Sequence, residues 1–375
     1  MLQGQWLAVD DSGKAFVILD ADFIGGRYVA TGFLTRYTVP DSRVLQVNFE
    51  FGEDLAARNF AVPAVSIRAM GPPNYGAQSL SAYEDEFTSI RNVQLVGELV
   101  EGKLRLRGNA DTGQCITAHL QRSAAHKPSV LRPNVDVNNW KTFTEYISAK
   151  KIGKFLYRGQ SSSKRLRTTF HRGGRSNLIH YLGENIDQTL MYLSSHLKHR
   201  YVRGGNDNGP ILALLQHHGY PTPLLDWTYS PYVAAFFAYR NVRQRRVEDT
   251  ETAKVRMFVF DLEAWLQTHY GLPVFEPGIP HLSPSAVPHL ENPRLFPQQG
   301  ISTVTNMDDI ETFIQAEELL HKRTFLEVID LPAAVRPDVY EQLRLMGITA
   351  GSLFPGIDGL CEALKEEHFP LLKST

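Results

Sequence analysis

The sequence predicts an α+β protein in two parts: a β-rich N-terminal domain, built as an antiparallel sheet or small barrel, and a mixed α+β domain. Three observations predict this. Runs rich in Val, Ile, Phe and Tyr alternate with Gly- and Asp-containing turns up to residue 122. Residues 125–136 hold two prolines and little apolar periodicity, which is typical of a linker. Helix-like and strand-like runs are mixed after residue 138. We therefore divide the chain into 1–124, a linker at 125–137, and 138–375.

Four turn signals separate the strands of the N-terminal part. They lie at Asp10–Gly13, Ile24–Arg27, Glu101–Gly102 and Asp111–Gly113, where glycine tolerates the positive φ of hairpin turns. The Pro- and Gly-containing stretch Met70–Ser79 is expected to be a loop. No cluster of acid and base residues occurs in this part of the sequence. We therefore expect an interaction module, with a protein as its partner.

Helices and strands mix in the second part. A helix is expected over Trp140–Ile147, before a strand that ends at Gly159. Apolar residues at helical spacing predict a helix over Leu178–Tyr201, and a further helix over Pro210–His218 is followed by Gly219 at the C-cap position.

Ser230 and Pro231 are expected to begin another helix, as N-cap and first helical residue. The run Tyr232–Tyr239 is apolar on nearly every face, so this helix should be buried. Interior strands are expected at Val255–Leu262 and Phe325–Leu331, where apolar residues are nearly continuous.

Composition limits the function. The 375 residues include 39 Lys and Arg against 40 Asp and Glu, a net charge of −1, so a histone-like coat on nucleic acid is excluded. Two cysteines, Cys115 and Cys361, build neither a four-thiolate zinc site nor a disulfide scaffold, and they suit a reducing compartment. No signal-peptide pattern and no apolar run of about 18 residues is present. We expect a soluble, cytoplasmic protein without a membrane partner.

Four segments of the second part carry a family resemblance. They are Phe155–Gln160, Leu214–Ala238, Asn292–Thr303 and Leu343–Leu360. In that order, they resemble the FRG domain family, which takes its name from an F/Y-R-G motif, over a little more than half of the chain. One departure is Pro223, because the family usually has arginine there and a positive charge is missing. The family implies no single activity.

A weaker similarity, of pattern only, relates the chain to mono-ADP-ribosyltransferases. It consists of Tyr157-Arg158-Gly159, then Thr228–Ser230, then the apolar helix at Ala234–Ala238. The similarity implies that arginine and hydroxyl groups hold NAD, while a glutamate of a later strand orients the ribose. At the matching place this chain has Gln298 and Gln299, and a glutamine carries no charge. A transferase that works by positioning, an enzyme with another acid, and a nucleotide-binding pseudoenzyme all remain open.

Arg158 is the residue on which the chemistry depends. Its guanidinium offers planar, paired donors for a phosphate or carboxylate, and Gly159 would let a ligand approach the backbone. The alternative is a buried arginine paired with a carboxylate. Asp226 is either that carboxylate, which we favour slightly, or a general base. Trp227 is expected in the core rather than stacked on a ligand.

His217 and His218 end a predicted helix. Adjacent helical residues point about 100° apart, so the pair is not expected to chelate one metal. One of the two either lies in the ligand cleft as an acid or base, or caps the last carbonyl groups of the helix.

Three basic stretches lie near these motifs, at Ser163–Arg175, His196–Gly205 and Tyr239–Glu248. They indicate either a surface that attracts a phosphorylated ligand or nucleic acid, or a solvated helix face. Nucleic acid is the weakest of the partner hypotheses, because no recognition motif accompanies the charge.

These observations give one expectation for the site. The ligand would be a nucleotide, NAD, with no metal, and the protein an NAD-using transferase or NAD-cleaving enzyme, as in a toxin or defence effector. The alternative is a module that binds a nucleotide or phosphorylated ligand without turnover. Arg158 would hold the pyrophosphate. Catalytic roles are expected for Arg158, His217, Asp226 and Gln298, and cofactor-binding roles for Tyr157, Gly159, Gln160, His218, Thr228, Ser230 and Gln299.

Overall fold

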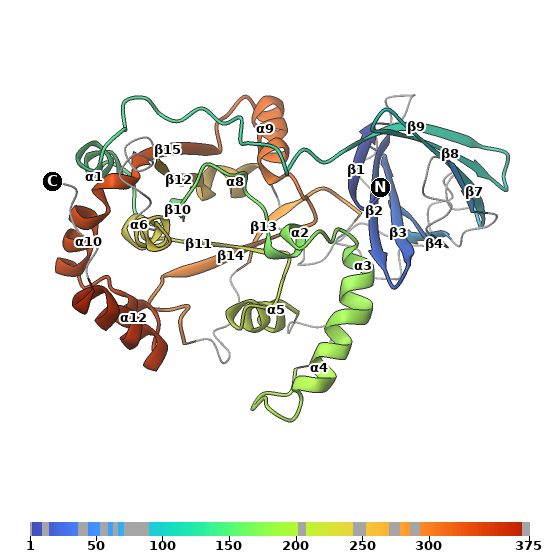
Figure 1. Cartoon of the computed structure of the whole chain (residues 1–375). Helices are drawn as coiled ribbons and strands as arrows, with labels where there is room; N and C mark the ends of the chain where they lie inside the picture. The colour runs from blue at the N-terminus through green and yellow to red at the C-terminus, as the bar shows by residue number, and fades with distance from the viewer. Residues whose placement is uncertain are drawn as a thin grey trace.

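Two β-sheets lie side by side in the computed structural model, each in its own part of the chain (Figure 1). This confirms the predicted α+β class. Among the described residues, every helix is too short or too polar to cross a bilayer. The structure describes residues 2–9, 15–36, 44–52, 59–62, 67–70, 90–201, 208–242, 253–269, 278–285 and 293–369.

The N-terminal sheet is antiparallel throughout and curls into a half-barrel, with strand order β5-β7-β8-β9-β1-β2-β3-β4-β6. Its concave face is filled by an apolar cluster that includes Trp6, Leu104 and Leu120. The strands are β1 (Gly4–Val9), β2 (Ala15–Ile24), β3 (Arg27–Arg36), β4 (Val44–Gly52), β5 (Asn59–Val62), β6 (Ile67–Met70), β7 (Val93–Val100), β8 (Lys103–Ala110) and β9 (Cys115–Arg122).

Three of the predicted turns are confirmed. Gly25 and Gly26, with φ of 58° and 81°, join β2 to β3, and this pair of positive φ values is the one a two-residue hairpin requires. The turn at Glu101–Gly102 joins β7 to β8, and the turn at Asp111–Gly113 joins β8 to β9. The expected turn at Asp10–Gly13 lies outside the described residues, as does the expected loop beyond Met70, where β6 ends.

The second sheet is antiparallel, in the order β13-β14-β11-β10-β12-β15. Helices α1, α6 and α10 pack on one face, and α8 and α9 pack on the other. The strands are β10 (Phe155–Gln160), β11 (Leu224–Thr228), β12 (Lys254–Asp261), β13 (Leu282–Ser285), β14 (Gly300–Thr305) and β15 (Leu326–Pro332). The helices are α1 (Trp140–Ser148), α2 (Thr169–Arg172), α3 (Leu178–His180), α4 (Asp187–Leu193), α5 (Asn208–His217), α6 (Pro231–Arg240), α8 (Leu262–Thr268), α9 (Ile310–His321), α10 (Arg336–Leu345), α11 (Ala350–Leu353) and α12 (Ile357–His368).

Two predicted elements differ from the structure. The helix expected to reach Tyr201 ends at Leu193 and contains a π-helical segment, Tyr181–Ile186, between α3 and α4. The strand β15 lies at a sheet edge instead of the interior. This edge strand is nearly continuously apolar because each of its faces packs on a core cluster. Val328 packs with the cluster under α9, and Ile329 packs with the cluster under α6. Both faces of this edge strand are therefore covered.

The expected linker, residues 125–137, makes hydrogen bonds with the part of the chain that carries the second sheet. The amide of Asn134 donates to the carbonyl oxygen of Val328 at 2.9 Å. Ser129 donates its hydroxyl to a carboxylate oxygen of Glu311 at 2.7 Å, and Arg165 donates its Nε to the carbonyl oxygen of Pro128. These contacts hold residues 128–134 against β15, α9 and Arg165.

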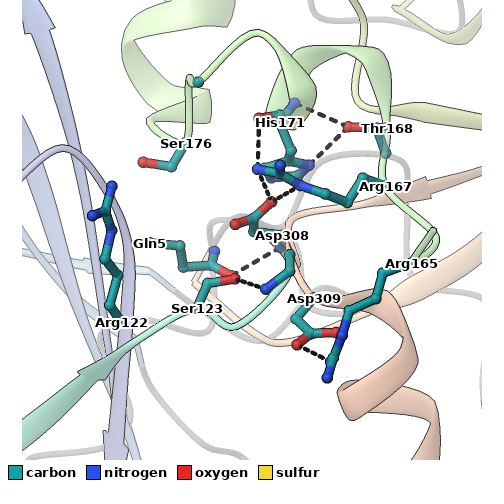
Figure 2. Close-up of polar contacts among 12 residues, drawn as sticks. Gln5, Arg122, Ser123, Arg165, Arg167, Thr168, His171, Ser176, Asp308 and Asp309 are labelled. Atoms are coloured by element: carbon teal, nitrogen blue, oxygen red, sulfur yellow. Dashed lines mark hydrogen bonds and ion pairs between the residues drawn. The ribbon is translucent and has the colours of Figure 1, made fainter. Parts of the chain in front are cut away.

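Polar side chains join the two domains across a buried interface (Figure 2). Gln5 of β1 is fully buried, and its amide donates to the carbonyl oxygen of Asn306 while its oxygen accepts from the amide of Asp308. Next to it, Arg167 donates to the carboxylate of Asp308 and to the carbonyl oxygen of His171. Burial lowers the pKa of His171 to about 4, so this imidazole is neutral at pH 7.

A second connection uses the carboxylate of Asp22 on β2, whose side chain is fully buried. It accepts from Nε of Arg175 at 2.6 Å and from the backbone amide of Ser176 at 2.7 Å. The N-terminal sheet thus holds the segment between α2 and α3, and α2 contributes to the site described next.

Candidate functional site

The second sheet opens between β10 and β11. Strand β10 pairs with β12 along its whole length, but it meets β11 in one residue pair only, Tyr157 with Thr228. A cavity of about 660 Å³ lies at this opening, between β10, β11 and β14, and α2, α5 and α6 contribute to its wall. This volume is within the range of small-molecule and cofactor sites.

The cavity brings together most of the residues that the sequence singled out. His218, Ser230 and Gln299 are not among the lining residues. The residues from the expected site that line the cavity are Tyr157, Arg158, Gly159, Gln160, His217, Asp226, Thr228 and Gln298.

Arg158 lines the cavity and is partly exposed there. Its Nη1 donates to the backbone carbonyl oxygen of Asp226 at 2.6 Å, and its buried Nε makes no hydrogen bond with any described residue. Burial lowers the pKa of Arg158 to about 10, with Asp226 opposing the shift and Arg172 adding to it. The guanidinium is therefore still charged at pH 7. The favoured ion pair with the Asp226 carboxylate is not formed, because the strand offers its carbonyl group instead.

Gly159 also has a packing role, which the sequence did not suggest. A Cβ atom there would lie 1.9 Å from the carbonyl oxygen of Ala234 and 2.8 Å from the Cβ atom of Ala238. The missing side chain therefore lets the backbone of α6 approach β10. The glycine of the Tyr-Arg-Gly motif and the alanines of the later helix form one packing contact.

The hydroxyl groups at the end of β11 already have internal partners. Thr228 donates to the carbonyl oxygen of Gln298 at 2.7 Å and accepts from the amide of Ser230 at 3.0 Å. The hydroxyl of Ser230 accepts from the amide of Val233 and caps α6, as predicted. Both side chains shape the corner that bounds the cavity.

The two glutamines lie in the turn before β14. Gln298 donates its amide to the carbonyl oxygen of Leu353 at 3.0 Å, which leaves its oxygen without a hydrogen bond to any described residue. Gln299 is exposed, and its φ of 47° marks a tight turn. Gln298 therefore lines the cavity, and Gln299 shapes the chain beside it.

Asp226 carries an oriented carboxylate. Its Oδ1 accepts from Nε2 of Gln216 at 2.5 Å and from the hydroxyl of Ser302 at 3.1 Å. Thr222 donates its hydroxyl to the oxygen of the same glutamine, which fixes that amide. The Oδ2 atom makes no hydrogen bond with a described residue. The next residue, Trp227, is buried in the core as expected, with its Nε1 bonded to Thr303.

Positive charge dominates the wall. Asp226 is the one carboxylate among the described residues that line this cavity. Four lining cations form no ion pair with a carboxylate of the described residues, and charges of one sign gathered at a cavity raise the local concentration of an anion. They are Arg158, Lys164, Arg172 and Arg294.

The basic stretch Ser163–Arg175 divides into two groups. Arg165 is paired with Asp309 at 2.5 Å, and Arg167 and Arg175 hold the interdomain contacts described above. Lys164 and Arg172 face the cavity without such partners. Three of the basic residues of this stretch are therefore engaged in internal ion pairs. The other two basic stretches lie partly outside the described residues.

An aromatic edge completes the cavity. Tyr229 is 37% exposed, and Phe237 and Phe354 line the same opening. The guanidinium of Arg294 lies 5.3 Å from the ring centre of Phe354. His217 lines the cavity at the end of α5, and His218 is exposed beside it with their ring centres 4.9 Å apart.

Sequence reasoning missed several wall residues. Gln216, Ser302 and Arg172 were not assigned to the site, although the first lies in the Leu214–Ala238 segment and the second in Asn292–Thr303. The signal in the sequence was that Gln216 and Ser302 belong to segments that carry the family resemblance.

Comparison with known proteins gives one match. Residues 153–247 match the model of the FRG domain family, which covers the first two of the four segments that suggested it. No curated protein matches the chain. No solved structure matches it either.

Proposed function

We propose that this chain, an FRG-domain protein, binds a phosphorylated nucleotide in the cavity between β10 and β11, with NAD as the ligand. The observation that carries the proposal is Arg158, which has a charged guanidinium at the cavity and a buried Nε without a partner. A buried donor that lacks a partner costs free energy until a ligand accepts from it. A phosphate oxygen is an acceptor of matching charge.

Three further cations extend this anion site. Arg172 of α2, Lys164 and Arg294 line the same cavity from different segments. This spread suits a pyrophosphate, because its two charged groups contact several donors at once. The exposed ring of Tyr229 offers a face on which a base can stack. The pattern shared with mono-ADP-ribosyltransferases favours NAD over other nucleotides.

An Arg158→Ala variant should bind NAD roughly 10- to 100-fold more weakly than the wild-type chain. Hydrogen bonds from a charged donor contribute about 1.5–3 kcal/mol, and 1.4 kcal/mol corresponds to a factor of ten. Isothermal titration calorimetry with NAD, ADP-ribose and ADP measures the effect.

The matched control is Arg132→Ala, because Arg132 is exposed and does not line the cavity. It should leave the affinity unchanged. Both variants should retain the wild-type melting temperature to within a few degrees. Equal affinities of Arg158→Ala and wild type for all three ligands would refute the nucleotide site.

A second candidate function is cleavage of NAD, and Asp226 favours it. Its Oδ1 is held by Gln216 and Ser302, while its Oδ2 has no partner among the described residues. When the bond between nicotinamide and ribose breaks, nicotinamide leaves with the bonding electrons and positive charge develops on the ribose. A fixed carboxylate stabilises that charge, and water or an acceptor then attacks the ribose. Consumption of NAD would suit a toxin or defence effector.

An Asp226→Asn variant should release nicotinamide at least about 100-fold more slowly, since one oriented electrostatic group is worth 10²–10³ in rate. Chromatography of nicotinamide released from NAD measures this, and calorimetry should show that the variant still binds NAD. If the wild-type chain binds NAD and releases no nicotinamide, the cavity is a binding module and the cleavage hypothesis is wrong.

A further inference from the structure

A second group of chemically capable side chains lies away from the cavity, where α8 ends beside α9. It consists of His269, Glu317 and His321, whose ligand atoms all lie within 4.8 Å of one another. None of the three lines the nucleotide cavity. The Nε2 atom of His269 is 3.0 Å from Oε2 of Glu317, and Nε2 of His321 is 3.5 Å from the same oxygen.

The local structure places these groups together. Glu317 and His321 are four residues apart on α9, so they share one face of the helix. His269 follows α8 directly, and its backbone amide donates to the carbonyl oxygen of Trp265, which ends the helix. Its ring stacks on the Trp265 ring, with centres 3.7 Å apart and planes 12° apart. The imidazole is therefore held in a defined orientation.

The other nitrogen of that ring has two neighbours. Nδ1 of His269 is 2.8 Å from the hydroxyl oxygen of Thr268 and 3.2 Å from the carbonyl oxygen of Trp265. When Nδ1 donates to that carbonyl group, which only accepts, Nε2 is the nitrogen that can bind a cation beside Glu317. A backbone hydrogen bond at one nitrogen and a metal at the other is the usual arrangement of a metal-bound histidine.

We propose that His269, Glu317 and His321 bind Zn²⁺. Two histidines and one glutamate form a known ligand set for zinc, with bond lengths of about 2.0–2.2 Å. Two such ligands at a tetrahedral angle are about 3.3 Å apart, and the observed separations of 3.0 and 3.5 Å lie on either side of that value. The remaining coordination position faces solvent, because the three side chains are between 20% and 31% exposed.

Such a metal would join α8 to α9. The ring of Phe325 lies 5.6 Å from that of His269 and 6.2 Å from that of His321, so one side of the site is apolar. An ion that binds the folded chain and not the unfolded chain raises stability by mass action. Zinc should therefore raise the melting temperature of the whole protein, whether or not the cavity is occupied.

Titration of the metal-free chain with zinc chloride, followed by calorimetry and thermal denaturation, tests the site. We expect one Zn²⁺ per chain and a higher melting temperature. His321→Ala and Glu317→Gln should each weaken zinc binding roughly 10- to 100-fold. His321 is the most exposed of the three side chains, so its removal should leave the fold intact.

The matched control is His126→Ala, an exposed histidine outside the cluster, which should bind zinc as the wild type does. Absorption of the Co²⁺-loaded chain gives an independent signature, since tetrahedral ligand fields differ from that of hydrated cobalt. Two results would overturn the proposal. One is no saturable zinc binding by the wild type, which would leave an imidazolium–carboxylate ion pair. The other is equal binding by wild type and His321→Ala.

Discussion

Gly159→Ala should lower the free energy of unfolding by about 3 kcal/mol or more, which is the upper end of the cost of overpacking. The added Cβ would lie 1.9 Å from the backbone oxygen of Ala234 and 2.7 Å from the backbone nitrogen of Ala238. Backbone atoms of α6 cannot move away by a change of rotamer, as the end of a flexible side chain can. Either the helix moves away from β10, or the strand bends, and both open the core between them. Urea denaturation measures the loss.

The matched control is Gly183→Ala, because nothing lies within 4 Å of a Cβ atom placed there. Gly183 is in the π-helical segment, where alanine should change stability by no more than about 1 kcal/mol. If Gly159→Ala were as stable as Gly183→Ala, the close approach of α6 would not be the reason for this glycine. Weaker ligand binding by Gly159→Ala would then indicate a direct role at the cavity.

The elements that the sequence predicted well depend on local chemistry. The hairpin at Gly25–Gly26 needs positive φ, and the helix after Ser230 needs a side-chain acceptor and proline at its first residue. Such requirements can be recognised within a few residues. The edge position of β15 was predicted wrongly, because an apolar strand has the same composition whether its neighbours are strands or helices. The end of the helix at Leu193 instead of Tyr201 has no explanation in the structure.

The candidate site also has features that the sequence predicts and features that only the folded chain creates. Arg158 and Asp226 lie in distinctive motifs, so their presence at one cavity could be inferred from sequence. The actual contact between them could not, because it depends on the backbone of β11 where its pairing with β10 stops. Gln216 and Ser302 reach Asp226 from α5 and β14, and only the folded chain brings those elements together.

The histidine cluster was missed for a related reason. The sequence drew attention to the adjacent pair His217–His218, and no metal was expected. The cluster combines the spacing of Glu317 and His321 on one helix with His269, which lies 48 residues earlier than the glutamate. A glutamate and a histidine four residues apart on a helix are too common to indicate a metal site by themselves. Its third member becomes visible only when α8 packs beside α9.

Asp22→Asn should destabilise the protein by about 3–5 kcal/mol, the usual cost of breaking a buried ion pair from one side. The Asp22 side chain is fully buried, and it accepts from Arg175 and from the backbone amide of Ser176. Asparagine has the same shape as aspartate but no charge. Its NH2 group replaces one carboxylate oxygen, so a hydrogen-bond donor would face the guanidinium of Arg175 or the amide of Ser176. Because these contacts join β2 to the segment after α2, the variant should also loosen the docking of the two domains.

The Arg27–Glu50 pair is the matched control, since its side chains are 61% and 51% exposed. Glu50→Gln should change stability by no more than about 1 kcal/mol, as exposed pairs do. Urea denaturation compares the variants, and proteolysis of the linker at 125–137 reports on docking. Asp22→Asn should be cut faster than Glu50→Gln, because looser docking of the N-terminal sheet lets the chain that joins the two parts open locally more often. Equal stability and equal cleavage would show that the two parts stay together without the Asp22 carboxylate, through Gln5 and the apolar cluster in which Ile179 and Ile279 pack against β2, β3 and β4.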